Sequence, residues 1–318
     1  MENTSELIAF GPIPSRRLGQ SLGINNIPPK SCTYSCVYCQ VGRTRDMPVD
    51  RKEFYQPKEI LREVKKKISE AGSKGEVIDY LSFVPDGEPT LDINLGREID
   101  MLRPSGIRIA VITNASLIWE KPVRDDLCRA DWVSVKIDAV SENAWRGTNR
   151  PYRSLKLENI LRGISEFSLI FKGTLTTETM LIQGVNDGEE EIKSIAGFIS
   201  GINAARSYIS VPTRPPAEQG VRPADEDAVN RAYQLFIEKG IDTECLTGYE
   251  GNAFAFTGDI KRDLLSITAV HPMRKEAVAG LLDKADAGWD IVENLIKKGD
   301  LLKVRYRGRD FYVRKTRL

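Results

Sequence analysis

The sequence has no long apolar run and only one histidine. No stretch approaches the roughly 18 apolar residues that a membrane-spanning helix needs. The first segment, Met1–Gln20, has no apolar core of the kind that a secretory signal carries. We therefore expect a cytoplasmic protein without a membrane segment. The single histidine, His271, leaves little material for a zinc site that combines histidine with cysteine.

A strong excess of charge of one sign is also missing. The 318 residues carry 46 Lys and Arg against 45 Asp and Glu, a net charge of +1. This balance excludes a polycation as a whole but allows a local basic patch. Apolar residues make up 41% of the chain and charged residues 29%, which permits a buried core and argues against disorder. The length suits one large domain with a small one attached.

Short β-rich segments alternate with longer helical segments over most of the chain. The expected strands are Ser21–Ile27, Val77–Val84, Ile107–Thr113, Trp132–Ala139, Thr174–Ile182, Ser207–Pro212 and Asp242–Leu246. The expected helices between them include Pro57–Ala71, Leu155–Phe167, Gly188–Ile199 and Ala224–Lys239. This alternation predicts a parallel sheet with right-handed crossovers. About six units are fewer than the eight of a full barrel, so we predict an α/β fold built as a partial (β/α)6 barrel.

The pattern changes after Phe256. Three helices are expected, followed by two strands that turn at Arg307-Gly308. Their ranges are Lys261–Val270, Arg274–Lys284, Ala287–Lys298, Leu301–Tyr306 and Arg309–Lys315. Three helices and a hairpin of this size are typical of a winged helix. We therefore predict two domains, residues 1–256 and residues 257–318.

Positive charge gathers in this C-terminal part. Residues 257–318 hold 14 Lys and Arg against nine Asp and Glu. Alternation puts two sets on opposite faces of the first strand, Lys303, Arg305 and Arg307 on one and Leu302, Val304 and Tyr306 on the other. We expect the apolar set to pack on the helices and the basic set, extended by Arg309, to stay in water. Such a stripe is either a solvated hairpin face or a contact to nucleic-acid phosphates.

Cysteine is scarce but unevenly placed. Three of the five cysteines, Cys32, Cys36 and Cys39, lie within eight residues with the spacing C-x3-C-x2-C. An odd number with three clustered is a poor disulfide framework, and in a reducing compartment such a cluster more often binds metal. Three thiolates on one loop can each bind one iron of a [4Fe–4S] cubane and leave the fourth iron open. The other readings are an incomplete zinc site and three unrelated buried thiols.

The two remaining cysteines are isolated. Cys128 falls in an expected helix, Val123–Arg129, and we expect it to be buried and inert. Cys245 lies on the last expected strand of the barrel and could face the site. These two cannot build a second four-thiolate cluster.

With the aromatic Tyr38 before its last cysteine, the motif resembles that of the radical S-adenosylmethionine (SAM) superfamily. The resemblance covers roughly residues 11–251. It implies a [4Fe–4S] cluster on Cys32, Cys36 and Cys39, whose fourth iron is chelated by the amino and carboxylate groups of SAM. It also implies that an electron from the reduced cluster cleaves SAM to methionine and a 5′-deoxyadenosyl radical, which abstracts hydrogen from the substrate. A one-electron donor of the flavodoxin or ferredoxin type is then needed.

Motifs at the ends of the expected strands extend the resemblance. The segment Pro85-Asp86-Gly87-Glu88-Pro89 resembles the Gly-Gly-Glu-Pro motif that contacts the SAM amino group, with Asp86 in place of the first glycine. A glycine at a strand end lets a ligand approach the backbone closely. The SAM contacts that the resemblance implies are Tyr38, Gly87, Glu88, Thr113, Asn114, Ser134, Val185 and Asn186.

One strand carries polar residues that should point into the barrel. Val133, Val135 and Ile137 share one face, and Ser134, Lys136 and Asp138 share the other. A buried lysine beside an acid is costly unless it is paired or used, so a plain ion pair and a ligand contact both remain open. The candidates for catalysis or substrate binding are Lys136, Asp138, Glu178, Thr213, Arg214, Tyr249 and Glu250. Two arginines in Pro14-Ser15-Arg16-Arg17 could neutralise an anion or lie on the surface.

The chain resembles in particular a subfamily distantly related to the tRNA 4-demethylwyosine synthases, through Pro14-Ser15-Arg16-Arg17, residues 211–215, residues 248–252 and residues 270–274. Those synthases carry a second cluster on upstream cysteines. No cysteine precedes Cys32 here, so their reaction is not expected. We expect a radical SAM enzyme that modifies a nucleoside of RNA, of tRNA in particular.

Two other functions stay open. One is a radical SAM enzyme that acts on a small metabolite or a protein. The other is a DNA-binding iron–sulfur regulator, against which Gly87-Glu88 and Thr113-Asn114 argue because a sensor needs no SAM pocket. The sequence indicates neither the oligomeric state nor the atom that loses hydrogen.

Overall fold

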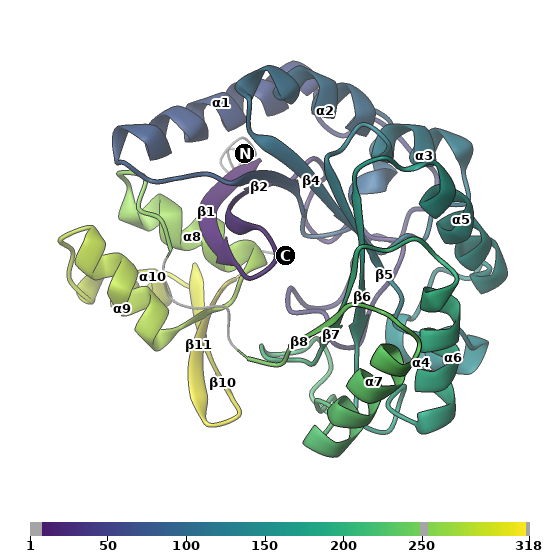
Figure 1. The fold of residues 1–318 in the computed structure, drawn as a ribbon. Coiled ribbons are helices and arrows are strands. Elements are labelled where there is room, and N and C mark those ends of the chain that lie inside the picture. Colours follow the sequence, from purple (N-terminus) through teal and green to yellow (C-terminus); the bar gives the residue numbers. More distant parts are fainter. Residues whose placement is uncertain (1–7, 249–253, 316–318) are drawn as a thin grey trace.

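The main body of the molecule is a curved sheet surrounded by helices (Figure 1). The structure is a computed structural model that describes residues 8–248 and 254–315. Eight strands pair in chain order: β1 (Ala9–Ser15), β2 (Gly19–Ile24), β3 (Tyr80–Phe83), β4 (Arg108–Thr113), β5 (Trp132–Lys136), β6 (Thr174–Met180), β7 (Arg206–Ser210) and β8 (Thr243–Leu246). β1 runs antiparallel to β2, and β2 to β8 are parallel. The predicted α/β partial barrel is therefore confirmed, with β1 as an unexpected edge strand.

Helices cover the outer face of this sheet (Figure 1). They are α1 (Pro57–Ser73), α2 (Leu95–Leu102), α3 (Lys121–Leu127), α4 (Glu142–Asn149), α5 (Leu157–Ile170), α6 (Glu189–Ser200) and α7 (Glu226–Glu238), with short 3-10 turns η2 (Pro89–Leu91) and η3 (Arg103–Ser105). α5 shows why they form: Leu157, Ile160, Ile164 and Phe167 recur at helical spacing and are all buried. Six strand–helix units run from β2 to α7.

The strands present opposite residues to the two sides of the sheet. On β5, Val133 and Val135 join the large core beneath the helices, whereas Trp132 belongs to a separate cluster inside the barrel. That cluster also contains Leu18, Tyr80, Ala110, Tyr208 and Leu246. Tyr80 and Trp132 begin their strands, so apolar side chains fill the barrel near the amino ends of the strands. The carboxyl ends are left for polar groups.

The C-terminal residues form a helical unit with its own small sheet. It contains α8 (Ile260–Val270), α9 (Lys275–Lys284), α10 (Asp290–Lys297), β9 (Met273–Arg274), β10 (Leu301–Tyr306) and β11 (Arg309–Arg314). The strands are antiparallel in the order β10-β11-β9. The three expected helices and the hairpin are present, and β9 adds a short third strand. Leu264, Ile267, Val278, Leu281 and Val292 are among the residues of its core.

This unit lies between β1 and β8, on the open side of the partial barrel (Figure 1). The Ala255 N–H donates to the Pro12 carbonyl of β1 at 3.1 Å, and Ile13 packs against the C-terminal core. Lys67 of α1 is 1% exposed, and its ammonium lies 2.8 Å from Thr257 Oγ1 and 3.1 Å from Asp263 Oδ1. The expected boundary at residue 256 therefore falls within a buried junction.

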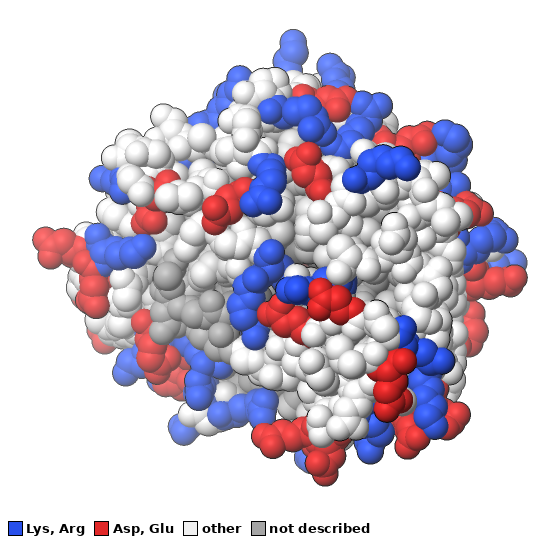
Figure 2. Space-filling view, in the orientation of Figure 1, with Lys and Arg blue, Asp and Glu red and all other residues white. Residues whose placement is uncertain are grey.

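Both faces of the hairpin are packed, where one was expected: on the expected apolar face, Phe311 lies opposite Val304, is 1% exposed and contacts Tyr306. Leu301 and Tyr312, which share the face of Lys303, join the C-terminal core, whereas Leu302 is 43% exposed. An alternating pattern defines the two faces of a strand, but it does not show which of them packs against other elements. The basic residues Lys303, Arg305, Arg307 and Arg309 are nevertheless all exposed. Lys and Arg side chains gather at the hairpin tip in Figure 2, where acidic and basic groups are otherwise intermixed.

Among residues 8–248 and 254–315, every helix falls short of the length and apolar character needed to cross a membrane.

Candidate functional site at the cysteine loop

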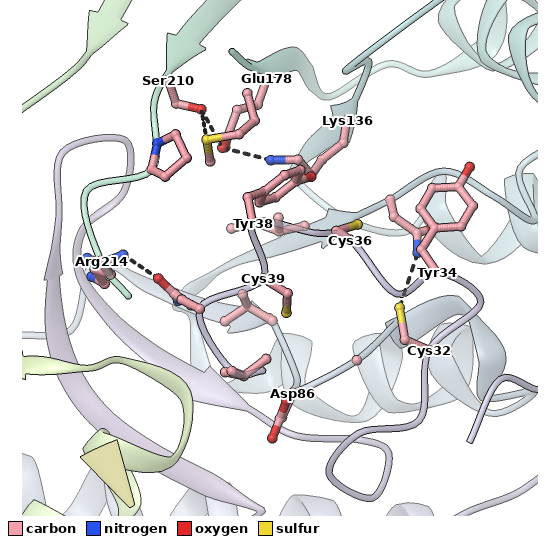
Figure 3. A pocket seen from close by; sticks show the side chains of 18 of the residues that line it. Cys32, Tyr34, Cys36, Tyr38, Cys39, Asp86, Lys136, Glu178, Ser210 and Arg214 are labelled. Atoms are coloured by element: carbon pink, nitrogen blue, oxygen red, sulfur yellow. Dashed lines mark hydrogen bonds and ion pairs between the residues drawn. The ribbon is translucent and has the colours of Figure 1, made fainter. Parts of the chain in front are cut away.

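A cavity of about 300 Å³ lies at the carboxyl ends of the strands. Each strand from β3 to β8, or the segment directly after it, contributes to the wall, and the loop after β2 contributes the cysteines. Active sites of barrel folds collect at this end because the strands converge there while their loops vary freely. Figure 3 shows the cysteines at one end of the cavity and a group of charged side chains at the other.

Cys32, Cys36 and Cys39 all line this cavity. The side-chain amide of Asn114 lies 3.4 Å from the sulfur of Cys32, and that of Asn149 lies 3.5 Å from the sulfur of Cys36. Burial raises the pKa of all three thiols, that of Cys36 to about 12. The thiols are therefore protonated at neutral pH unless a positive group such as iron binds them.

The donor set fits an iron–sulfur cubane better than a single metal ion. Among the residues that the structure describes, no three His, Cys, Asp or Glu side chains converge as they would around one ion. A cubane does not require such convergence, since each of its three protein thiolates binds a different iron. His271 does not line the cavity, and its Nε2 atom lies 3.1 Å from Arg214 Nη2. The cysteines could therefore hold a [4Fe–4S] cluster.

Gly87 brings the strand end after β3 against the cysteine loop. The Glu88 N–H donates to the Ser31 carbonyl at 3.1 Å, and the two segments form a parallel bridge at Ser31 and Gly87. A Cβ atom on Gly87 would lie only 1.9 Å from the Ser31 oxygen. Glycine is therefore required here for packing of the loop, whether or not a ligand also approaches this backbone.

The Glu88 carboxylate joins the segment after β3 to the end of β4. Its Oε1 accepts from Thr90 Oγ1 and Thr113 Oγ1, each at 2.6 Å, and its Oε2 accepts from the Asn114 N–H at 2.7 Å. Although burial raises the pKa of Glu88, these hydrogen bonds favour its ionised form. Oε2 accepts fewer bonds than Oε1, so it has room for a further donor. Thr113 and Asn114 line the cavity beside it, as expected.

Lys136 and Glu178 form an ion pair at the far end of the cavity (Figure 3). Lys136 Nζ lies 3.0 Å from Glu178 Oε1, and the Arg17 guanidinium contacts the other carboxylate oxygen. Burial alone would raise the pKa of Glu178, but Arg17 and Lys136 lower it to about 2. The Lys136 ammonium also lies 5.1 Å from the centre of the Tyr38 ring. Lys136, Glu178 and Tyr38 therefore line the cavity as expected. Lys136, Arg17 and Glu178 together carry a net positive charge.

Asp138 lies outside the cavity wall and supports the cysteine loop from behind. Its carboxylate accepts from the Tyr38 hydroxyl and from Asn149 Nδ2, the latter at 2.7 Å. Asn149 in turn contacts Cys36. The structure therefore gives Asp138 a supporting place rather than direct contact with a ligand.

Three other expected contacts do not line the cavity. Ser134 faces the barrel interior but is completely buried below the cavity. Asn186 is also completely buried, and its amide donates to the carbonyls of Asp138 and Met180. Val185 is 38% exposed on the loop after β6. The resemblance therefore points to the loop after β6, but the side chains of Val185 and Asn186 on that loop do not line the cavity.

The segment after β7 connects the cavity to the C-terminal unit. Thr213 and Arg214 line the cavity. Arg214 lies 2.7 Å from Gln40, next to Cys39, and 3.1 Å from His271. Sequence reasoning assigned His271 no place near the site, because nothing in the sequence shows that α8 returns to the barrel. Tyr249 and Glu250 lie outside the described residues.

The remaining sequence expectations have mixed outcomes. Arg16 and Arg17 both line the cavity; Arg17 is half-buried, whereas Arg16 stays exposed and donates to the Gly248 carbonyl at 3.1 Å. Cys245 packs towards the helical core, since its neighbour Leu246 occupies the cavity side. The expectation that Cys128 is buried is wrong: it is exposed just after α3, whose buried positions are Val123 and Leu127.

Comparisons with known proteins agree with this geometry. A sequence model of the Radical SAM superfamily matches residues 26–196. The UPF0026 protein of Methanocaldococcus jannaschii is 46% identical over 96% of both chains, and that of Helicobacter pylori strain 26695 is 34% identical over 73% of this chain and 74% of its own. A solved radical SAM methyltransferase from Sphaerobacter thermophilus matches with a TM-score of 0.57 at 18% identity, covering 71% of this chain and 66% of that one. At that identity the likeness shows a shared fold.

Proposed function

Because the chain belongs to the radical SAM superfamily, whose members bind a [4Fe–4S] cluster and SAM, we propose that it cleaves SAM and modifies a nucleoside of RNA, of tRNA in particular. Membership of this family makes it an iron–sulfur enzyme. The proposal for the site is that Cys32, Cys36 and Cys39 hold the cluster. The observation that carries it is that these cysteines and the polar ends of four neighbouring strands line one cavity.

The chain's own residues would hold and orient SAM. When bound, the cluster supplies the electron that splits SAM into methionine and a 5′-deoxyadenosyl radical. The Gly87 backbone and Glu88 Oε2 lie beside the cysteine loop, where an amino group could donate to the carboxylate. Asn114 contacts Cys32 and so ties this side of the wall to the cluster loop. Apolar residues such as Ile112 and Val211 complete the wall and exclude water.

The size of the cavity favours a substrate that is presented at its rim. Pockets for drug-sized ligands measure roughly 300–1,000 Å³. The cluster and SAM would therefore fill most of a cavity of about 300 Å³. A macromolecule can insert a single group while the rest stays outside. The Tyr306 hydroxyl donates to the Pro212 carbonyl at 3.2 Å, which places the basic hairpin next to a cavity residue. This arrangement supports an RNA substrate held by Lys303, Arg305, Arg307 and Arg309.

The C-terminal unit supports the same proposal. Its elements follow the order helix, strand, two helices and two strands, which suits the winged-helix interpretation of residues 257–318. Its exposed basic hairpin could contact phosphates without reading sequence. We keep the small-metabolite or protein substrate as the alternative, since the cavity itself would admit a small group of either kind.

The cluster assignment is tested by anaerobic reconstitution. We expect the wild-type protein to carry about four irons per chain and, with dithionite and SAM, to form 5′-deoxyadenosine. Replacing Cys32, Cys36 or Cys39 with Ala should abolish this product, because each thiolate binds a different iron. Cys128→Ala is the matched control and should retain both iron and product, since Cys128 is exposed and away from the cavity. A cluster that survives the triple substitution would contradict the assignment.

The RNA proposal predicts salt-dependent binding. Binding to bulk tRNA should weaken steeply with salt, because released counterions drive phosphate contacts. Changing Arg305, Arg307 and Arg309 to Ala should reduce the slope by up to about three, near one for each lost contact. Cleavage of SAM without RNA should be unchanged in this variant. Analysis of the incubated tRNA nucleoside by nucleoside should reveal a new base or ribose. If the wild-type protein binds no RNA at low salt, the RNA proposal fails and a small metabolite or a protein becomes the favoured substrate.

A further inference from the structure

A buried ion pair lies directly under the cysteine loop. The side chains of Lys30 and Asp86 are 7% and 5% exposed, and Lys30 Nζ lies 3.6 Å from Asp86 Oδ1. Both residues line the cavity together with Cys39. Asp86 stands where the motif that this segment resembles has a glycine, and the function proposed above gives it no role.

The backbone holds Lys30 in an unusual conformation. Its φ is +67°, in the left-handed region that a residue with a side chain rarely adopts. The Lys30 N–H donates to the Asp86 carbonyl at 2.7 Å, and the Lys30 carbonyl accepts from the N–H groups of Arg45 and Asp46. These three hydrogen bonds fix both residues relative to the loop that carries the cysteines.

The ammonium of Lys30 lies beneath the turn that contains Cys39. The Gly42 N–H donates to the Cys39 carbonyl at 3.1 Å, which closes this turn. A Cβ atom built on Gly42 would lie 3.5 Å from Lys30 Nζ, so the charge is in contact with the turn. Figure 3 shows Asp86 below Cys39 on the same side of the cavity.

The hydrogen bonds at Lys30 and Asp86 do not require charged side chains. The backbone groups of Lys30 and Asp86 make the hydrogen bonds, and these would form with uncharged side chains as well. Burying two charges has a desolvation cost that an apolar pair would avoid. What the charges add is an electrostatic field at the nearest thiolate, in a region where water screens little.

We propose that Lys30 and Asp86 set the reduction potential of the cluster, with Lys30 favouring the reduced state and Asp86 the oxidised state. Reduction adds one negative charge, which a nearby cation stabilises and a nearby carboxylate opposes. Charge near the sulfur ligands is one of the means by which proteins tune iron–sulfur potentials. The inference rests on the proposed cluster at Cys32, Cys36 and Cys39. Lys30 and Asp86 are positioning residues that act through the cluster and do not touch the reacting atoms.

The test is a redox titration of the reconstituted protein followed by electron paramagnetic resonance at pH 8. Lys30→Gln should lower the midpoint potential and Asp86→Asn should raise it. Each shift should correspond to about a tenfold change in the equilibrium constant for one-electron reduction, about 59 mV. The double variant should return close to the wild-type value. Opposite shifts that cancel are not expected from loosened packing, which would move both variants in the same direction.

Matched variants separate charge from position. Lys30→Arg keeps the charge and should leave the potential near the wild-type value. Asp86→Gly removes the carboxylate in a different way and should raise the potential as Asp86→Asn does. Asp126→Asn removes a carboxylate that pairs with Arg51 and does not line the cavity, so it should have no effect. Iron content and melting temperature identify any variant whose loop has collapsed.

Three outcomes overturn the inference, and they are distinguishable. Wild-type protein that takes up no cluster would overturn the proposed function and this inference together. Full cluster uptake with an unchanged potential in Asp86→Asn and Asp86→Gly would overturn this inference alone. Shifts of the same sign in Lys30→Gln and Asp86→Asn would also overturn it.

Discussion

Two carboxyl groups, those of Asp92 and Glu98, lie buried against each other behind the cavity wall. Asp92 is 0% exposed and Glu98 is 1% exposed, so burial opposes the ionised form of both carboxyl groups. Burial, together with the charge of Asp92, raises the pKa of Glu98 to about 9, and burial raises that of Asp92 to about 7. A pair of this kind binds more protons in the folded state than in the unfolded state.

The first prediction at this scale is that Glu98→Gln stabilises the protein in alkaline solution. Glu98 ionises near its ordinary pKa when unfolded but only near pH 9 when folded. The free energy of unfolding of the wild type should therefore fall as pH rises from about 5 to 9. Glutamine removes this dependence and should be more stable than wild type by about 1–3 kcal/mol at pH 9. The advantage should shrink towards pH 5.

Denaturant unfolding at pH 5, 7 and 9 measures this difference. Glu142→Gln is a suitable control, because Glu142 is exposed on α4 and pairs only with Arg146 among the described residues. The prediction fails if Glu98→Gln is equally destabilising at all three pH values.

Motifs in the sequence mark several of the residues that the structure brings to one cavity. The three cysteines, Glu88, Thr113, Asn114 and Arg214 were expected at the site and do line the cavity. Lys30 and Asn149 could not be assigned, because their importance comes from contacts with segments that are distant in the chain. Cys128 shows a related difficulty: Val123 and Leu127 form the buried stripe of α3, and Cys128, one position further along, lies off that stripe and is exposed.

At the scale of elements, the strand end after β3 and the cysteine loop are packed too closely for any side chain on Gly87. We predict that Gly87→Ala displaces the loop and lowers iron incorporation severalfold. The added methyl group would meet the Ser31 backbone, which cannot move without moving Cys32. Iron per chain after reconstitution measures the effect.

The matched control for Gly87→Ala is Gly188→Ala. Gly188 is the N-cap residue directly before α6 and has a φ of −68°, and a Cβ atom there would meet nothing within 4 Å. This variant should take up iron like the wild type. Equal iron in both variants would show that the loop adapts to the larger residue.

The elements missed by sequence reasoning share physical causes. β1 contains Pro12 and Pro14, which argue against a strand in general but are tolerated at the edge of a sheet. α2 and α4 have only eight residues each, too few for a clear helical period. The strands from β2 to β8 were predictable because their β-rich segments alternate with longer helical periods.

At the scale of the whole molecule, the buried lysine Lys67 joins the barrel to the C-terminal unit. Its ammonium contacts Thr257 and Asp263 and also lies 3.5 Å from Glu70. We predict that Lys67→Met lowers the free energy of unfolding by about 3–5 kcal/mol, because Asp263 is left buried without its partner. Thermal and denaturant unfolding measure the loss.

A second substitution tests the cause of that loss. In Lys67→Met with Asp263→Asn, no unpaired charge remains, and the asparagine oxygen can still accept from Thr257. Much of the lost stability should return. If the double variant is no more stable than Lys67→Met alone, the loss comes from packing rather than from the buried charge.

The position of the C-terminal unit also determines the order in which the molecule can assemble. Each strand pairs with the strand before it in the chain, so the sheet can grow by short-range steps. The contact between Pro12 and Ala255 instead joins the two ends of the barrel sequence and requires closure of a very long loop. The open side of the barrel is therefore expected to close only after the parallel strands have paired.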